Sequence, residues 1–246
     1  MLSTWPEQSK PTEPLQGHVD VWAVDINSLV ERLDEMTASL SDVECIRSAE
    51  FRVAAARQRY IITRAEMRSL VGRYLGIAPT AVILSLDLNG KPRLENTAPR
   101  DLRINVAHSA NIGLLAVTLG CEVGVDVEHV RPVNHATQLA RRYFQSAELE
   151  AIAAAEPLNR DRAFLRCWTA KEAILKSVGS GITGKLDTFG VPVKEFDATW
   201  IGLPAQVGFE RPIRCWLQEL SPCQDYVGAV ACVGEPRNLR CQSLAL

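Results

Sequence analysis

The sequence predicts an α+β protein built from two similar halves. Two observations carry this prediction: segments with strand-like alternation are mixed with helical segments, and the order strand, helices, hairpin occurs twice along the 246 residues. A chain of this length can bury a substantial core, as one large domain or two closely packed lobes. We expect a loose N-terminal tail over residues 1–16, an N-terminal lobe over 17–118 and a C-terminal lobe over 119–246.

The first half should contain strands on either side of a helical region. Residues 18–26 alternate well enough for a strand, and Pro, Ser, Thr and Glu dominate the preceding tail. Asn89-Gly90 is a typical hairpin dipeptide, because both residues tolerate a positive φ. The expected elements, in order, are a strand over 18–26, a helix over 29–40, a short and then a long helix within 41–75, and strands over 80–88, 104–107 and 112–119.

The long helix of the first half is strongly basic. Between residues 52 and 73 there is one acidic residue, Glu66, against six arginines: Arg52, Arg57, Arg59, Arg64, Arg68 and Arg73. The net charge of the chain is −2, so attraction to an anion must come from a local patch of this kind. A solvated helix face with no partner is the alternative interpretation.

The second half begins with a short acidic strand. Val123, Val125 and Val127 alternate with polar residues and glycine, so Asp126 and Glu128 project from one face of the strand. Neighbouring carboxylates repel each other unless water or a positive charge separates them. Exposure to solvent is one solution, and a hard divalent cation such as Mg²⁺, which takes oxygen ligands, is the other.

A helix over residues 161–178 carries the second charged motif, Trp168 to Lys176. Its apolar residues recur at helical spacing and Gly179 supplies a stop signal: Phe164, Trp168, Leu175 and Val178 form the buried face. Glu172 and Lys176 share another face. As an exposed pair they would contribute only about 0.2–0.5 kcal/mol. Beside the acidic strand, Glu172 would instead supply a third carboxylate and Lys176 a cation for a phosphate.

Two short helices and a hairpin complete the second half. Residues 134–144 and 147–156 read as helices, with Ser146 as the N-cap of the second, and 213–220 with 226–233 read as the hairpin. Glu148 lies in the first helical turn, where the helix dipole alone favours an acid. The residues from 234 onward give no clear signal.

Four segments of the chain, taken together, resemble one enzyme family. They are Val123–Glu128, Trp168–Lys176, Asn89–Pro92 and Ile104–Ser109. Their sequences and order resemble those of the 4′-phosphopantetheinyl transferases, in the larger, two-lobed form typified by the enzyme that activates surfactin synthetase. The resemblance extends from about Arg47 to Leu186.

The resemblance implies a fold, a reaction and a metal. The fold is a pseudo-twofold pair of α/β lobes with coenzyme A in the cleft between them. The reaction transfers 4′-phosphopantetheine from coenzyme A to a serine of an apo acyl or peptidyl carrier protein and releases adenosine 3′,5′-bisphosphate. Asp126, Glu128 and Glu172 would hold Mg²⁺, or Mn²⁺, on the pyrophosphate.

The resemblance also implies roles for individual side chains. Lys176 would contact phosphate and Glu148, which follows Arg142-Tyr143-Phe144, would act as general base. The implied coenzyme A contacts are Arg47, Arg59, Gly90, Lys91, Pro92, His108, Lys171 and Lys176. Two positions depart from the family pattern: Ala107 replaces a usual serine, and Glu44 stands where a basic residue is usual.

The composition of the chain indicates in which cellular compartment this chemistry would occur. Hydrophobic residues make up 47% of the chain, no stretch is long enough to span a membrane, and the slightly acidic balance gives no sign of nucleic-acid binding. The seven cysteines include no Cys-x-x-Cys pair, which favours reduced thiols in the cytoplasm. We expect a monomer, since the lobes would pair within one chain.

Two other functions stay open at this point. A Mg²⁺-dependent hydrolase acting on coenzyme A would consume it without a carrier, and a non-catalytic module would only bind carrier proteins. The four charged residues Asp126, Glu128, Glu172 and Lys176 favour an enzyme, because a binding module has no need of all four. The choice among carriers of fatty-acid, polyketide and nonribosomal-peptide biosynthesis is also open.

Overall fold

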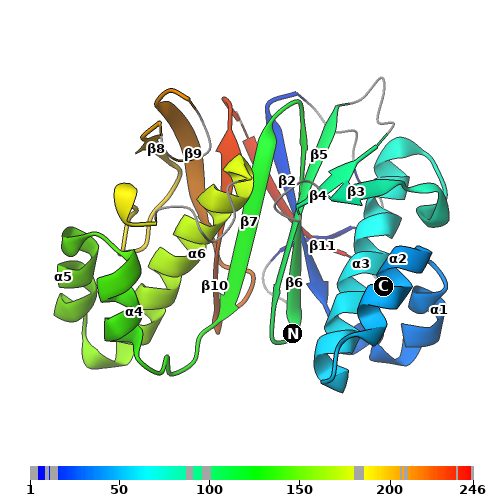
Figure 1. Cartoon of the computed structure of the whole chain (residues 1–246), viewed down its shortest axis with the longest axis horizontal. Coiled ribbons are helices and arrows are strands. Elements are labelled where there is room, and N and C mark those ends of the chain that lie inside the picture. The colour runs from blue at the N-terminus through cyan, green and yellow to red at the C-terminus, as the bar shows by residue number, and fades with distance from the viewer. Residues whose placement is uncertain are drawn as a thin grey trace.

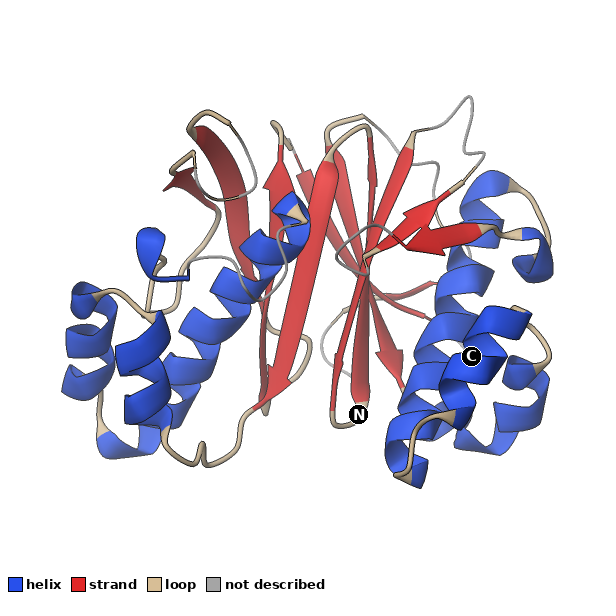
Figure 2. Cartoon of the chain, in the orientation of Figure 1, coloured by secondary structure: helices blue, strands red, loops and turns tan. Residues whose placement is uncertain are grey.

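The computed structural model has mixed α/β architecture, with its strands in three sheets between outer groups of helices (Figures 1 and 2). It describes residues 5–8, 11, 16–86, 91–95, 101–179, 186–205, 207, 210–236 and 238–244. Within these ranges, no helix has the length and apolar character needed to cross a bilayer.

The first sheet joins the two ends of the chain. Its strand order is β1-β11-β2-β6-β5, where the strands are β1 (Glu7–Gln8), β11 (Asn238–Leu244), β2 (His18–Asp25), β6 (Ile112–Leu119) and β5 (Leu102–Ser109). β11 lies parallel to both of its neighbours, and the other pairs are antiparallel. A buried network fixes β11 in place, because Arg240 bonds to Asp20 of β2 through both carboxylate oxygens, at 2.5 and 2.7 Å.

Four helical segments lie on the outer side of the first sheet (Figure 1). They are the 3₁₀ segment η1 (Asn27–Arg32), α1 (Leu33–Thr37), α2 (Asp42–Ala49) and the long α3 (Ala54–Leu75), with α2 packed on α3. Ser41 and Glu44 form a capping box that begins α2, and Gly76, at a φ of 70°, ends α3. The buried face of α3 packs its apolar side chains on Trp22, Leu115 and Val117 of the sheet.

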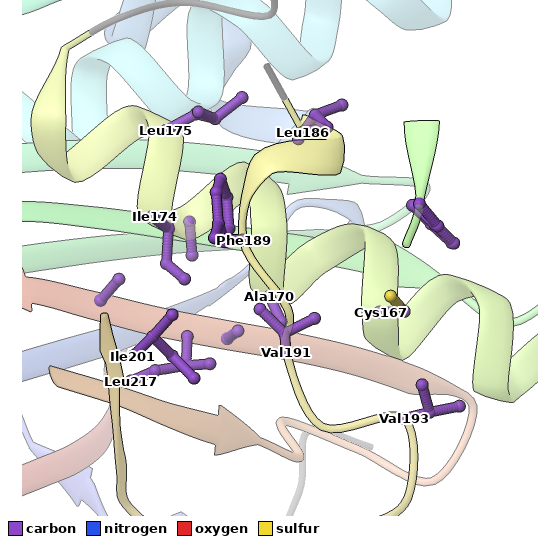
Figure 3. Close-up of a cluster of buried hydrophobic side chains, with 14 of the residues drawn as sticks. Cys167, Ala170, Ile174, Leu175, Leu186, Phe189, Val191, Val193, Ile201 and Leu217 are labelled. Carbon is purple, nitrogen blue, oxygen red and sulfur yellow. The ribbon is translucent and has the colours of Figure 1, made fainter. Parts of the chain in front are cut away.

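The second sheet is entirely antiparallel and has the order β7-β10-β9-β8. Its strands are β7 (Glu122–His129), β10 (Tyr226–Val233), β9 (Ile213–Leu220) and β8 (Thr199–Leu203). Its helices are α4 (Ala136–Tyr143), α5 (Ser146–Ala154) and α6 (Arg160–Val178). Figure 3 shows Ala170 and Ile174 of α6 in the apolar cluster with Phe189, Ile201 and Leu217.

The facing edges of the two sheets are β5 and β7. β5 ends the order of the first sheet, β7 begins that of the second, and the two strands lie against each other. A shared apolar cluster packs the sheets together, with Val21 and Leu114 from the first and Val125 and Val230 from the second. In the described part of the chain, no backbone ladder joins β5 to β7, so side chains make the junction.

Most predicted elements are confirmed, and the differences have local causes. The expected strand over 80–88 is shorter: Pro79 begins a 3₁₀ turn, η2 (Pro79–Ala81), before β3 (Leu84–Leu86), which pairs with β4 (Pro92–Leu94). The Asn89-Gly90 turn between them lies outside the described residues. Gln145, not Ser146, is the N-cap of α5.

The strands β1, β8 and β11 were not predicted. Within the expected tail, Glu7–Gln8 pairs with Ser243 and Leu244, while most of residues 1–16 lie outside the described ranges. β11 draws residues 238–244 from the end of the chain into the sheet of the first half. The lobe limits at 17–118 and 119–246 stay predictions.

Candidate active site

A cavity of about 410 Å³ lies at the junction of the two sheets. Its walls come from α3, the start of β4, β5, β7 and the end of α6. The lining residues are Tyr60, Thr63, Arg64, Lys91, Pro92, Asn105, Val106, Ala107, His108, Asp126, Leu175, Lys176 and Gly179. Four predicted site residues are therefore brought together here in addition to Asp126: Lys91, Pro92, His108 and Lys176.

A glycine on β7 allows α6 to approach the cavity. A Cβ atom added to Gly124 would lie 2.1 Å from the carbonyl oxygen of Ala173 and 2.3 Å from the amide nitrogen of Ser177. Both neighbours are backbone atoms of α6, so a larger residue would push the helix away from the strand. This contact brings the helix face that carries Lys176 to the strand face that carries Asp126.

Asp126 and Lys176 form an ion pair in the cavity wall. The Lys176 ammonium donates to Oδ1 of Asp126 at 2.7 Å and to the carbonyl oxygen of Val125 at 3.2 Å. Burial raises the pKa of Asp126, against the lowering effect of Lys176, and the neighbouring charge of Glu128 raises it further. The positive charge of Lys176 therefore does not fully offset the cost of burying the Asp126 carboxylate.

Glu172 adds a third carboxylate to the same place. It is buried, and within the described residues its Oε1 finds no hydrogen-bond partner. Burial first, then the negative charge of Asp126, raises the pKa of Glu172 to about 7. An unpartnered buried carboxylate oxygen beside two other acids is the donor chemistry that a hard cation satisfies.

In this conformation the side chains of Asp126, Glu128 and Glu172 do not converge on one point as metal ligands would. Among the residues that the structure describes, no three His, Cys, Asp or Glu side chains are gathered in a metal-binding arrangement. Lys176 occupies Oδ1 of Asp126, and Glu128 is held by Ser109 at 2.7 Å and by Arg131 at 2.8 Å. The residue types fit a divalent cation, while their present partners include two cationic side chains.

Glu128 borders a second cavity, of about 400 Å³, that adjoins the first. Its lining residues are Arg59, His108, Ser109, Ala110, Glu128, His129 and Arg131. His108 lines both cavities. Desolvation at the cavity wall, followed by the positive charge of Arg59, lowers the pKa of His108, so its ring favours the neutral form. A neutral ring retains one N–H donor.

The edge of β7 that faces β5 is bonded by side chains of the predicted motifs. Asn105 accepts the Val125 N–H at 2.8 Å, and Ser109 accepts the His129 N–H at 3.1 Å. Lys91 donates to the Val123 carbonyl oxygen at 3.1 Å and to Glu122 at 2.9 Å. These side chains take the place of a neighbouring strand, and they fix the position of Asp126 and Glu128 relative to β5.

Glu148 and Lys171 lie elsewhere, in the apolar core between α5, α6 and residues 186–191. Their charged atoms are 3.0 Å apart, and both side chains are buried. Lys171 also donates to the carbonyl oxygens of Leu186 and Phe189, at 2.7 and 2.6 Å. Glu148 accepts the N–H groups of Gln145 and Val191, each at 2.7 Å. Neither residue lines the two cavities described above.

This position does not support the predicted contact of Lys171 with coenzyme A or direct proton transfer by Glu148. Each group already has protein partners on its charged atoms, and each is enclosed by core side chains. A general base must come within hydrogen-bonding distance of the proton that it takes. The local sequence pattern contains no sign of this enclosure, because the partners at 186–191 are distant in sequence.

The remaining predicted contacts differ in their surroundings. Arg47 is exposed, pairs with Glu50 and lies over the Phe51 ring, and it lines neither cavity. Glu44 is buried and accepts from Arg68 at 2.6 Å, so the position where the family usually has a basic residue serves here as a core anchor. Gly90 lies outside the described residues.

Several cavity residues were not selected from the sequence. Tyr60, Thr63 and Asn105 line the first cavity and Arg131 the second. Tyr60 and Thr63 lie one helical turn apart on α3, so a helical plot of the basic segment would have placed them beside Arg59 and Arg64. Asn105 and Ser109 are four residues apart in β5 and therefore lie on the same face of the strand. The alternation of the Ile104–Ser109 segment could have predicted this from the sequence.

Comparison with known proteins identifies the family. Residues 122–231 match the family described as the 4′-phosphopantetheinyl transferase superfamily. The 4′-phosphopantetheinyl transferase HetI of Nostoc sp. (strain PCC 7120 / SAG 25.82 / UTEX 2576) is 31% identical over 233 residues, 94% of each chain. A 4′-phosphopantetheinyl transferase of Bacillus subtilis is 26% identical over 203 residues, covering 82% of this chain and 86% of the relative. The chain therefore belongs to the 4′-phosphopantetheinyl transferase superfamily.

Proposed function

We propose that this protein transfers the 4′-phosphopantetheine group of coenzyme A to a serine hydroxyl of an apo acyl or peptidyl carrier protein. The serine oxygen forms a bond to the phosphorus that bears the pantetheine arm, the pyrophosphate bridge breaks, and adenosine 3′,5′-bisphosphate leaves. One observation carries the proposal: in a chain of this family, Asp126, Glu172 and Lys176 meet beside a cavity at the junction of the sheets.

The residue types beside the cavity fit a magnesium ion. We assign Asp126, Glu128 and Glu172 as its ligands, and Mn²⁺ is a chemically acceptable substitute. When bound, the ion would offset negative charge on the phosphate oxygens of the attacked pyrophosphate. Among the described residues Oε1 of Glu172 has no hydrogen-bond partner, which supports this assignment, since a buried carboxylate oxygen without a donor is costly unless something positive binds it.

Lys176 is assigned to the phosphate. Within the described part of the chain its ammonium group bonds to Asp126 and to the Val125 carbonyl oxygen, which leaves one of three N–H donors for a phosphate oxygen. Because Asp126 holds the lysine in the cavity wall, the cation is positioned before the substrate binds. Phosphoryl transfer depends mostly on such positioning and on electrostatic stabilisation.

The serine proton requires an acceptor close to the same place. Glu148, or a water that it orients, is the candidate from the sequence; because the Glu148 carboxylate is enclosed in the core and Glu172 is assigned to the cation, we assign direct proton acceptance to a water in the cavity. Glu148 then acts indirectly, by holding Lys171 and residues 189–191 against α6.

The nucleotide end of coenzyme A is assigned to the basic side of the cavities. His108 and Arg59 line the second cavity, and Lys91 and Pro92 line the first. Arg47 and Gly90 stay candidates for the same end. The basic character of α3 supports this orientation, because coenzyme A carries its 3′-phosphate there and the whole chain is slightly acidic.

The remaining expectations complete the proposal. The two halves would be related by a pseudo-twofold axis, and the enzyme would act as a cytoplasmic monomer. The shared apolar cluster between the sheets supports pairing within one chain. The carriers would belong to fatty-acid, polyketide or nonribosomal-peptide biosynthesis, and the two cavities do not discriminate among these.

The proposal is tested by the intact mass of an apo carrier protein after incubation with the protein, coenzyme A and Mg²⁺. We expect a gain equal to one phosphopantetheine group, abolished by EDTA. Loss of coenzyme A with no change in several carrier types would favour a hydrolase. No change in either, with carrier binding intact, would favour a binding module. Either result would refute the proposed transfer.

A further inference from the structure

Ser109, the last residue of β5, bonds to two neighbouring residues at the end of β7. Its hydroxyl donates to Oε2 of Glu128 at 2.7 Å and accepts the backbone N–H of His129 at 3.1 Å. A hydroxyl has one proton to donate, so the N–H that it accepts orients that proton towards the carboxylate. The Ser109 side chain thereby ties the Glu128 carboxylate to the backbone of its own strand.

Arg131 bonds to the same carboxylate oxygen. Its Nη1 donates to Oε2 of Glu128 at 2.8 Å and to the His129 carbonyl oxygen at 3.0 Å. Both donors thus act on Oε2, and among the described residues no other hydrogen bond reaches the Glu128 carboxylate. The carboxylate is therefore held at one oxygen, and Oε1 is left for a ligand.

The two donors differ in how firmly they hold. Ser109 is half-buried, has a short side chain and lies in a paired strand, where its backbone is fixed opposite Ile112. The Arg131 side chain is 52% exposed and can rotate into solvent at little cost. Ser109 therefore contributes more to the orientation of Glu128 than Arg131 does.

We infer that Ser109 is a positioning residue, which, together with Arg131, holds Oε2 of Glu128 so that Oε1 faces the divalent cation. The inference rests on the proposed function, since it concerns the ligand that Glu128 would bind. Carboxylates that bind metals are usually held by such outer hydrogen bonds, and loss of one typically costs about 10–100-fold in metal affinity or activity. Glu128 needs this support because Asp126, its neighbour on the same strand face, repels it.

The experiment measures Mn²⁺ binding to the full chain by the electron paramagnetic resonance signal of the free ion. For Ser109→Ala we expect binding about 10–100-fold weaker than wild type. Ser109→Thr keeps the hydroxyl and should restore most of the affinity. Arg131→Ala should weaken binding less than Ser109→Ala does, because Arg131 is more exposed.

Ser39→Ala is the matched control. The Ser39 hydroxyl makes a bond of the same length, 2.7 Å to the carbonyl oxygen of Met36, and it lines neither cavity at the junction of the sheets. Its removal should leave Mn²⁺ affinity unchanged. Circular dichroism and thermal unfolding in EDTA establish that all variants are folded when binding is measured.

Steady-state kinetics give a second readout that a merely structural role would not move. With carrier and coenzyme A saturating, Ser109→Ala should raise the Mg²⁺ concentration that gives half-maximal rate, and Ser109→Thr should bring it back towards the wild-type value. Wild-type Mn²⁺ affinity in folded Ser109→Ala, or failure of Ser109→Thr to restore affinity, would overturn the inference. If wild type modifies no carrier but the binding series follows the expected order, the proposed transfer fails and the positioning role stands.

Discussion

Two lysines five residues apart on α6 each pair with a carboxylate, and the two pairs have different surroundings and different roles. Lys171 and Glu148 are 3.0 Å apart with side-chain exposures of 0% and 4%, and Lys176 and Asp126 are 2.7 Å apart with exposures of 30% and 12%. The first pair is enclosed, because backbone groups of Leu186, Phe189 and Val191 complete its hydrogen bonds. The second borders a cavity, beside a buried carboxylate that has a bare oxygen in the described structure.

This difference in hydrogen bonding distinguishes a charged pair that stabilises the fold from a charged pair that can bind a ligand. A buried ion pair with full hydrogen bonding stabilises one arrangement of the chain, here the contact of residues 186–191 with α6. A buried pair with an unsatisfied neighbour stores electrostatic repulsion, which a bound cation can relieve. The perturbed pKa values of Asp126, which lines the first cavity, and of Glu172 beside it follow this second pattern.

The largest expected effect comes from removing the carboxylate of the second pair. Asp126→Ala should slow phosphopantetheine transfer more than about 100-fold, because phosphoryl transfer relies on electrostatic stabilisation of the phosphates. The protein should stay folded, since Lys176 is partly exposed and can be hydrated. The rate of carrier mass gain and the circular dichroism spectrum check both statements. Near-normal transfer would refute the metal assignment.

Breaking the first pair should act on stability instead. Glu148→Ala leaves Lys171 as a buried, unpaired charge, which typically costs about 3–5 kcal/mol in the free energy of unfolding. Urea unfolding measures this loss. The double variant Glu148→Leu with Lys171→Met should recover much of it, because apolar side chains of similar size can replace a buried pair.

The kinetics of Glu148→Gln sharpen the comparison. Glutamine can accept only one of the two backbone N–H bonds, from Gln145 or from Val191, because its amide nitrogen is a donor, and it cannot act as a base at neutral pH. We expect kcat, per folded molecule, to stay within a few-fold of wild type. A loss of kcat comparable with that of Asp126→Ala, in folded protein, would restore Glu148 as the proton acceptor.

A smaller effect is expected where α6 meets β7. Gly124→Ala would place a methyl group 2.1 Å from the Ala173 carbonyl oxygen, so the helix must move. Overpacking of this kind costs about 1–3 kcal/mol. Transfer should also fall, because the shift separates Lys176 from Asp126. Gly202→Ala is the control, since an added Cβ there meets no atom of the described residues within 4 Å; equal stability of the two variants would contradict the close packing.

The smallest predicted effect is a pH dependence of the metal-free protein. The pKa of Glu172 is raised to about 7 by burial, so the folded state binds a proton that the unfolded state releases near its ordinary pKa. Stability therefore falls as pH rises towards and through 7, by about 1 kcal/mol between pH 6 and 8. Thermal unfolding in EDTA should show this slope in wild type and less of it in Glu172→Gln. An unchanged slope in the variant would remove Glu172 as its source.

Local patterns sufficed to predict the strand of Asp126 and the helix of Glu172, whereas their meeting was implied by the resemblance to the family. Period-two alternation and helical spacing are short-range signals, and the structure confirms β7 and α6 where they were expected. The roles of Lys171 and Glu148 depend on residues 186–191, and β11 depends on Arg240 bonding to Asp20 across most of the chain. No short window of sequence contains such long-range partners. The burial of these residues, which determines their roles, could therefore not be predicted from local patterns.

The central claim is that the carboxylates of the junction hold a divalent cation, and a crystal grown with coenzyme A and Mn²⁺ tests it most directly. The account predicts an anomalous-scattering peak within coordination distance of oxygen atoms of Asp126, Glu128 and Glu172. It would be contradicted by well-ordered coenzyme A with no peak among these residues and with the Lys176 ammonium still bonded to Asp126 as its sole charge partner.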